Sequence, residues 1–283
     1  MRSDQGGTVS GRLSYSNPNL QQIPARNKEF GNKIRSLFLP EEGKQWGSFD
    51  YSQQEPRLVA HYAASVTENF QGADEFIEAY QNESADFHQI VADMAGISRT
   101  HAKTINLGLF YGMGKAKLAK ELGIDKESAE RLLLNYNNRV PFVKKLATEV
   151  TNSASKYGFI RTIKGRKCRF DMWEPSTFGM NKAMQYGEAK AYYGNNIRRA
   201  FTYKALNRLI QGSAADQTKQ AMINCYKEGF KPMLQIHDEL CFSINSESYV
   251  KNVKEIMENA IENLKVPFKV DVAIGGSWGE AKE

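Results

Sequence analysis

Hydrophobic positions recur at helical spacing through the middle of the chain. Between about residues 67 and 200, most apolar residues repeat every three or four positions, which is the period of one buried helix face. A basic hairpin at 158–170 is predicted to interrupt this pattern. Helices are therefore predicted near residues 72–80, 86–95, 99–111, 114–121, 126–137, 141–156 and 180–200.

The two ends of the chain mix strands with helices. The opening thirty residues, rich in Ser, Asn, Gln, Gly and Pro, are typical of extended strands and turns. Pro56 suits the first turn of the helix expected after it, and further helices are expected near 205–228 and 247–264. Strands at both ends around a helical block predict an α+β fold with a helical insertion. The predicted strands are residues 44–50, 233–236, 240–244 and 268–274.

Composition narrows the class of protein. The 283 residues are 41% hydrophobic and 25% charged, as in a globular chain with a real core. No apolar run approaches the ~18 residues of a membrane span, and the start has no apolar signal core, so we expect a cytoplasmic protein. The three cysteines lie far apart without CxxC spacing, which argues against a disulfide scaffold or a zinc site.

Charge allows a nucleic-acid partner without requiring one. Lys and Arg number 38 against 32 Asp and Glu, a net charge of +6. The segment Arg161–Arg169 has five basic residues in nine and no acid, which suits a phosphate backbone. A solvated hairpin tip would explain the same segment.

Three acids lie at the ends of predicted strands. Asp50 ends the strand at 44–50, while Asp238 and Glu239 lie in a turn between two apolar strands. Because an unpaired buried charge is costly, acids on a common sheet edge are suited to sharing divalent cations. Two Mg²⁺ ions would then serve an in-line displacement. Alternatively, Asp50 caps the next helix and Asp238 makes a turn.

One predicted helix carries a stripe of chemically distinct side chains. Arg99, Lys103, Leu107 and Tyr111 follow one another at four-residue intervals, so they lie along one side of the helix. The guanidinium and the ammonium suit a triphosphate, and the apolar and aromatic groups suit a sugar and a base. Alternatively, this is a helix with a solvated basic end and a buried aromatic end.

Three segments, in order, resemble the motifs of family A DNA polymerases. Asp50–Arg57 resembles motif A, Arg99–Gly112 resembles motif B, and Gln235–Glu239 resembles motif C. The resemblance runs from residue 10 to the region of Trp278, so it covers essentially the whole chain. Supporting matches are Ser10–Ser14, Asn17–Gln21, Asn207 and Gln211–Asp216.

The resemblance implies a partial right-hand polymerase fold of class α+β. An antiparallel-sheet palm would comprise residues 1–62 and 196–283, and helical fingers would comprise 63–195. The implied activity is that of a DNA-directed DNA polymerase, which adds deoxynucleotides to a primer 3′-hydroxyl by two-metal phosphoryl transfer. The implied cofactor is a pair of Mg²⁺ ions. The implied partners are primer–template DNA and deoxynucleoside triphosphates.

The resemblance also implies roles for single residues. Asp50, Asp238 and the Tyr51 carbonyl would hold the metals, with Glu239 as an auxiliary acid. Glu55 would obstruct a ribose 2′-hydroxyl. The phosphates of the nucleotide would be bound by Arg99, Lys103 and His88, and Lys103 is counted among the catalytic residues. Leu107 and Tyr111 would border the incoming nucleotide. The primer terminus and minor groove would be contacted by Arg12, Asn207, Gln211 and His237.

Gln54 and Leu107 are among the positions that depart from the family pattern. Gln54 puts a polar group where motif A packs an apolar residue. Leu107 stands where the best-known members carry Phe or Tyr, and in this it resembles a subset of viral members.

The region before motif A is the larger departure. Family members have a thumb, preceded by an exonuclease domain, but this chain opens almost at Gly11–Arg12. We therefore expect either a fragment or a split polymerase with a separate thumb- and exonuclease-bearing chain. The alternative function is a non-autonomous DNA-binding subunit, active only with such a partner. Glu55 and the residues of motif B argue against the third possibility, a related single-subunit RNA polymerase.

Overall fold

The computed structural model describes residues 8–23, 28–66, 77–78, 80–81, 86–110, 113, 115–177, 179 and 182–282. Its contacts divide the chain into two compact units. Unit 1 comprises residues 1–57 and 213–283, and unit 2 comprises residues 58–212. None of the described helices is both long enough and apolar enough to span a bilayer.

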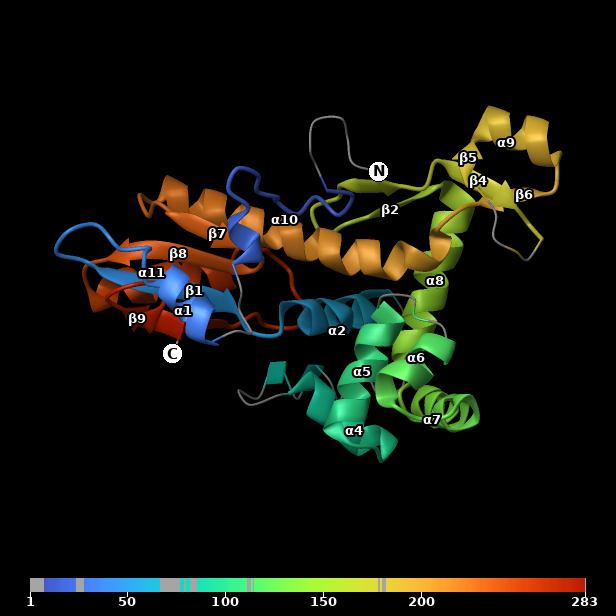
Figure 1. Cartoon of the computed structure of the whole chain (residues 1–283), viewed down its shortest axis with the longest axis horizontal. Coiled ribbons are helices and arrows are strands. Elements are labelled where there is room, and N and C mark those ends of the chain that lie inside the picture. The colour runs from blue at the N-terminus through green and yellow to red at the C-terminus, as the bar shows by residue number, and fades with distance from the viewer. Residues whose placement is uncertain are drawn as a thin grey trace. The chain divides into compact units, whose positions relative to one another are not determined.

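Unit 1 is built on a four-stranded antiparallel sheet with the order β7-β8-β1-β9. Strand β1, from early in the chain, pairs with β8 and β9 from its far end, and Figure 1 shows the blue strand among red and orange ones. The register sets Asp50 on β1 between Glu239 on β8 and Asp271 on β9. The bounds are β1 (Gln45–Tyr51), β7 (Leu234–Ile236), β8 (Glu239–Ile244) and β9 (Val270–Gly275). The predicted α+β class is confirmed.

Aromatic packing fixes the central strand of this sheet. Phe49 on β1 meets Phe242 edge to face, with ring centroids 5.3 Å apart, and both side chains are fully buried. Helix α11 (Glu247–Glu258), capped by Ser246, lies against β9, and the Tyr51 hydroxyl donates to the Met257 carbonyl at 2.7 Å. Burying each such ring stabilises the fold by about 1.5–3 kcal/mol. The acid at the end of β1 is therefore held by a rigid core.

Unit 2 contains the helices that the apolar period predicts. Asp86 and Asp125 cap the starts of α4 and α7 with their carboxylates, and Gly96 and Gly158 end α4 and α8 in the left-handed conformation. The prediction at 72–80 falls mostly outside the described residues. The helices are α4 (Phe87–Ala95), α5 (Arg99–Phe110), α6 (Lys115–Leu122), α7 (Lys126–Arg139) and α8 (Pro141–Tyr157).

Several further elements complete the chain. Helices α2 and α10 each run through a boundary between the units. The elements are η1 (Leu20–Gln22), α1 (Lys28–Arg35), α2 (Gln54–Val66), η2 (Thr202–Lys204), α10 (Ala205–Lys227) and η3 (Glu280–Lys282). The predicted basic hairpin forms as β2 (Phe159–Arg161) and β3 (Lys167–Arg169).

The structure corrects the prediction of a single helix over 180–200. This region contains β5 (Met184–Gln185), α9 (Tyr186–Tyr193) and β6 (Ile197–Arg199). Together with β4 (Met172–Pro175), the strands form a small sheet of order β5-β4-β6. The helix stops because Gly194 takes a positive φ of 74°, after which Ile197–Arg199 pairs with β4.

The strands expected in the first thirty residues are wrong for the part that the structure describes. The described residues between 8 and 23 join no sheet, and several of their polar groups bond to one another. The Thr8 hydroxyl donates to the Arg12 carbonyl, and the Gln21 amide donates to the Leu13 carbonyl. The described residues of this segment form turns and η1.

Candidate active site

Two acids of the predicted metal site meet where strands of unit 1 end. The Tyr51 amide donates to the Asp238 carbonyl at 3.4 Å, which joins the end of β1 to the turn between β7 and β8. His237 opens this two-residue turn with a positive φ of 56°, and Gln235 donates to its carbonyl at 2.5 Å. The turn therefore presents Asp238 next to Asp50 in a fixed backbone geometry.

Both acids resist ionisation. Burial, followed by the negative charge of Asp238, raises the pKa of Asp50 to about 6. Burial also raises the pKa of Asp238, against the opposing effects of its own backbone N–H and of Arg12. Two such carboxylates would be stabilised by a shared divalent cation.

The donors fit a cation that is only partly bound by protein. Among the described residues, no group of three or more His, Cys, Asp or Glu side chains is arranged to hold a metal. Mg²⁺ accepts one or two carboxylates and takes its remaining oxygens from water and substrate phosphates. The pair Asp50 and Asp238 meets that need.

Glu239 is bound to the core and to a lysine. Its Oε1 accepts from the Ser48 hydroxyl at 2.6 Å and from the Trp278 indole at 3.2 Å, and Glu239 is only 6% exposed. Its Oε2 lies 3.1 Å from the Lys282 ammonium, which is also 3.6 Å from Asp50 Oδ2. Glu239 thus positions Lys282 beside Asp50.

Lys282 was missed by sequence reasoning. Burial lowers its pKa, but the charges of Glu239 and Asp50 outweigh burial and leave the pKa raised, so the ammonium stays charged. Lys282 lies 232 positions after Asp50 in the sequence, in a segment without a recognisable motif. No local signal in the sequence could have identified it.

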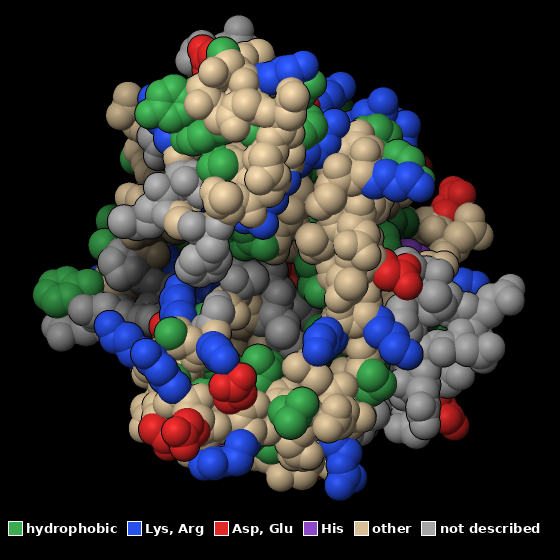
Figure 2. Space-filling view, turned by 90° about the vertical axis from the view of Figure 1, so that its right-hand side faces the viewer, with side chains coloured by type: hydrophobic (Ala, Val, Ile, Leu, Met, Phe, Trp, Pro, Cys, Tyr) green, Lys and Arg blue, Asp and Glu red, His purple; other side chains and the backbone are tan. Residues whose placement is uncertain are grey.

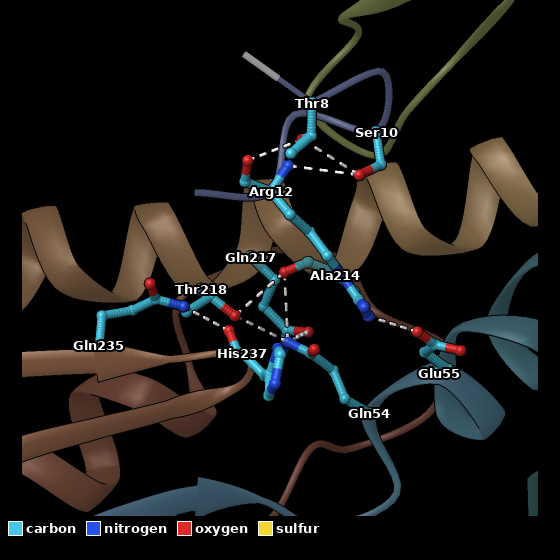
Figure 3. Close-up of polar contacts among 10 residues, drawn as sticks. All are labelled: Thr8, Ser10, Arg12, Gln54, Glu55, Ala214, Gln217, Thr218, Gln235 and His237. Carbon is cyan, nitrogen blue, oxygen red and sulfur yellow. Dashed lines mark hydrogen bonds and ion pairs between the residues drawn. The ribbon is translucent and has the colours of Figure 1, made fainter. Parts of the chain in front are cut away.

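Figure 3 shows how the predicted Arg12 and Glu55 lie in unit 1. Arg12 Nη2 and Glu55 Oε1 form an ion pair at 2.5 Å. Gln54 next to Glu55 is buried, and its amide nitrogen has acceptors on Ala214, Gln217 and Thr218 of α10 within 3.3 Å. This explains the polar departure in motif A, because Gln54 fastens the first turn of α2 and so orients Glu55.

A cavity of about 170 Å³ adjoins this ion pair. It brings the predicted Arg12 and His237 to one surface, together with part of α10. Its other lining residues are Thr8, Ser10, Leu13, Ser14, Gln21, Ala215, Thr218, Lys219, Met222 and Gln235.

The predicted phosphate-binding residues lie in unit 2. Both Nη2 and Nε of Arg99 contact Asp86 Oδ2, at 2.6 and 2.8 Å. Asp86 also accepts from the backbone amide of His88 at 2.9 Å. This network joins the starts of α4 and α5, and Lys103 is exposed one turn further along α5.

A buried hydrogen-bond network determines which ring nitrogen of His88 carries the hydrogen. The Tyr136 hydroxyl donates to Asn106 Oδ1, so the Asn106 amide nitrogen is the donor to His88 Nδ1 at 3.1 Å. Burial lowers the pKa of His88, while Asp86 opposes this effect. The neutral ring therefore carries its hydrogen on Nε2, which makes that nitrogen a donor.

Asn106 and Tyr136 were also missed, although the sequence holds one signal. Asn106 follows Ala102 by four residues on the buried side of α5, and both are fully buried. A polar residue on an otherwise apolar helix face requires a buried partner.

The other predicted residues are distributed as follows. Asn207 and Gln211 are one turn apart in the part of α10 that belongs to unit 2, and both are half-buried. Leu107 lies within α5, but its side chain and the whole of Tyr111 are outside the described residues.

Comparisons with known proteins agree with the motifs. Residues 2–280 match the family described as DNA polymerase family A. The chain is 38% identical to a DNA-directed DNA polymerase of Pseudomonas phage M6, over 97% of this chain and 44% of that protein. It is 34% identical to the thermostable DNA polymerase I of Thermus aquaticus, over 100% of this chain and 32% of that protein.

A solved structure shares the fold. The polymerase domain of Pol1 from M. smegmatis, solved with DNA primer–template and dNTP, matches with a TM-score of 0.77 and 33% identity. The match covers 98% of this chain and 47% of that one. The chain therefore spans less than half the length of each of these relatives.

Proposed function

The chain belongs to DNA polymerase family A, and we propose that it supplies the palm and fingers of a DNA-directed DNA polymerase. The palm is residues 1–62 and 196–283, and the fingers are residues 63–195. The observation that carries the proposal is the acid pair of unit 1. Asp50 and Asp238 are held together at strand ends although burial raises both pKa values.

The reaction is attack of a primer 3′-hydroxyl on the α-phosphate of a deoxynucleoside triphosphate. One P–O bond forms, the bond to the leaving group breaks, and pyrophosphate is released. Asp50, Asp238 and the backbone carbonyl of Tyr51 would hold two Mg²⁺ ions, which supply charge stabilisation to the attacking and leaving oxygens. The relative solved with primer–template and dNTP supports these partners. Phage relatives support the host cytoplasm as the setting.

Unit 2 would bind the triphosphate. Lys103 is a compact cation for the leaving phosphates, and Arg99, held by Asp86, offers the remaining hydrogens of its guanidinium. His88 donates from Nε2 because Nδ1 is occupied by Asn106. Leu107 and Tyr111 border the nucleotide.

Unit 1 would check the sugar and the primer end. The Glu55 carboxylate, held by Arg12, obstructs a 2′-hydroxyl. Arg12 and His237 would contact minor-groove acceptors, which A·T and G·C pairs present at similar places. Asn207 and Gln211, which belong to unit 2, would make contacts of the same kind. Such contacts test the shape of a base pair without reading its sequence.

Primer extension tests the proposal with a control on the same sheet. Asp238→Asn removes one charge of the acid pair and should abolish extension in Mg²⁺. Asp271→Asn removes an exposed acid from β9, opposite Asp50 in the register, and should leave extension near that of the wild type. Extension by folded Asp238→Asn would contradict the proposal. The rival hypothesis of a non-autonomous subunit predicts DNA binding by the wild-type chain without extension until a partner chain is added.

A further inference from the structure

A small module in unit 2 has two aromatic rings that are largely exposed. We define the α9 module as the described residues of Met172–Arg199, which comprise β4, β5, α9 and β6. Helix α9 has eight residues, of which Ala189 alone is fully buried. Tyr186 is 51% exposed and Tyr192 is 74% exposed. Tyr186 contacts Trp173 and Tyr192 contacts Tyr193 edge to face, with ring centroids 5.0 and 4.8 Å apart, so much of each tyrosine ring stays exposed. Exposed rings side by side on a short helix point to a ligand.

A groove lies beside the more exposed ring. Its volume is about 410 Å³, and Lys182, Met184, Glu188, Ala191 and Tyr192 line it. The Tyr193 hydroxyl donates to the Lys182 carbonyl at 3.2 Å, which ties the lysine segment to the helix. An aromatic ring and an ammonium group therefore flank one opening, in a local backbone that is held in place.

The module is fastened to the basic hairpin. The Arg199 guanidinium lies 4.6 Å from the centre of the Trp173 ring and donates to the Phe170 carbonyl at 3.0 Å. It occupies the space beside Gly158, where a Cβ would come within 2.6 Å of it. Trp173 in turn packs against Tyr186, with ring centroids 5.0 Å apart. The tyrosines are thus placed in fixed relation to the hairpin of β2 and β3.

The charge of this surface favours one class of ligand. Arg198 is paired with Glu174 at 3.0 Å. The remaining charges are those of Lys182, Lys190 and the five basic residues of the hairpin against two acids, Asp171 and Glu188. In Figure 2 hydrophobic and basic side chains lie among one another on the upper part of the face shown. Rings separated by cations match the bases and phosphates of a single strand better than they match the continuous apolar patch of a protein partner.

We propose that the α9 module binds single-stranded DNA, with bases stacked on Tyr192 and Tyr186 and phosphates contacted by Lys182 and Lys190. The assignment of that strand as the unpaired template rests on the proposed polymerase function. The stacking surface itself does not, because it is defined by the rings and charges of unit 2 alone. Stacking on tyrosine tolerates any base, as a copied template requires.

Fluorescence anisotropy with a labelled oligo-thymidine strand tests the surface directly. The double variant Tyr186→Ala and Tyr192→Ala should weaken binding by about 5- to 150-fold for each base that loses its stack. Tyr192→Phe keeps the ring and should bind like the wild type. Tyr226→Ala, which removes a 64% exposed tyrosine from α10 in the other unit, is the matched control and should change nothing.

Salt dependence and extension complete the test. Lys182→Gln should reduce the salt slope of single-strand binding by about 0.7, the value for one lost phosphate contact. The double tyrosine variant should fill a one-nucleotide gap at the wild-type rate but extend poorly on a long unpaired template. If the wild type does not polymerise, the binding measurement still decides the inference. Unchanged oligo-thymidine affinity in the double variant would overturn it and leave these rings to a protein partner.

Discussion

The charged groups of the two units are held in opposite ways. In unit 1 Asp50 and Asp238 are half-buried and have raised pKa values, and the buried Glu239 joins Lys282 to Trp278 of the aromatic core. In unit 2 Arg99 and Lys103 are exposed, and Arg99 is held by a surface ion pair with Asp86. Moving a buried charge costs more free energy than moving an exposed one. Under the proposed function, unit 1 would therefore supply fixed catalytic groups and unit 2 would bind the incoming nucleotide.

The largest of these effects is expected at Lys103, which has no ion pair with an acid among the residues that the structure describes. Lys103→Ala should lower kcat/KM for the nucleotide by about 10²–10³-fold, the cost typical of losing one group that stabilises developing charge. Arg99→Ala should cost less, because Asp86 already neutralises part of its charge. Single-nucleotide incorporation measures both. Lys117→Ala on α6 is the control, and a larger loss for Arg99 than for Lys103 would contradict this difference.

The next largest effect concerns the selection of the sugar by Glu55, whose carboxylate is held in place in unit 1. Glu55→Ala opens the space that its carboxylate fills, so discrimination against ribonucleotides should fall by about 10–200-fold. Arg12→Ala should also lower discrimination against ribonucleotides, but less than Glu55→Ala does, because it frees the Glu55 carboxylate without removing it. Competition between matched ribo- and deoxynucleotides measures the ratio. Glu55→Gln preserves the bulk and should preserve selectivity, and unchanged selectivity in Glu55→Ala would refute the steric role.

A smaller effect should follow from breaking the buried network behind His88. Tyr136→Phe leaves Asn106 Oδ1 buried without its donor, so the free energy of unfolding should fall by about 1–3 kcal/mol. In the wild type, ¹⁵N NMR of the imidazole should show hydrogen on Nε2 and none on Nδ1. The variant should lose this preference because Asn106 is then free to turn. An Nδ1-protonated ring in the wild type would contradict the network.

The smallest effect is a pH dependence from the same ring. Because burial lowers the pKa of His88, its NMR titration midpoint should lie below the usual value of about 6.5. As the pH falls, His88 is therefore protonated at a higher pH in the unfolded chain than in the folded chain. The His88 contribution to stability is complete above pH ~6.5 and is lost as pH falls through the lower folded value. Denaturant unfolding of wild type and His88→Gln at several pH values measures it, and a midpoint above 6.5 would reverse the sign.

Local signals predicted much of the fold, and their limits are physical. The helices from α4 to α8 follow from apolar period and capping, since Asp86, Asp125 and Pro141 act within their own turns. The region of α9 was mispredicted as one helix because β6 exists only through its pairing with β4, which periodicity does not register. Long-range pairing decides such segments.

The same limit applies to the site. The predicted strand ends pointed to Asp50 and Asp238, the motif resemblance supported them, and the structure brings them together through the amide of Tyr51. Lys282 and the contact between Asn106 and Tyr136 came only from the structure, because each joins residues from separate elements. Gln54 was noted as a departure, and its reason became clear from its acceptors on α10.

Metal binding tests the central claim most directly, because that claim is that Asp50 and Asp238 form a cation site for phosphoryl transfer. Mn²⁺, observed by electron paramagnetic resonance in place of Mg²⁺, reports bound metal with primer–template and nucleotide present. The wild type and Asp271→Ala should bind Mn²⁺ alike, whereas Asp50→Ala and Asp238→Ala should each lose most of the bound signal while remaining folded. Wild-type Mn²⁺ binding by folded Asp50→Ala or Asp238→Ala would contradict the account.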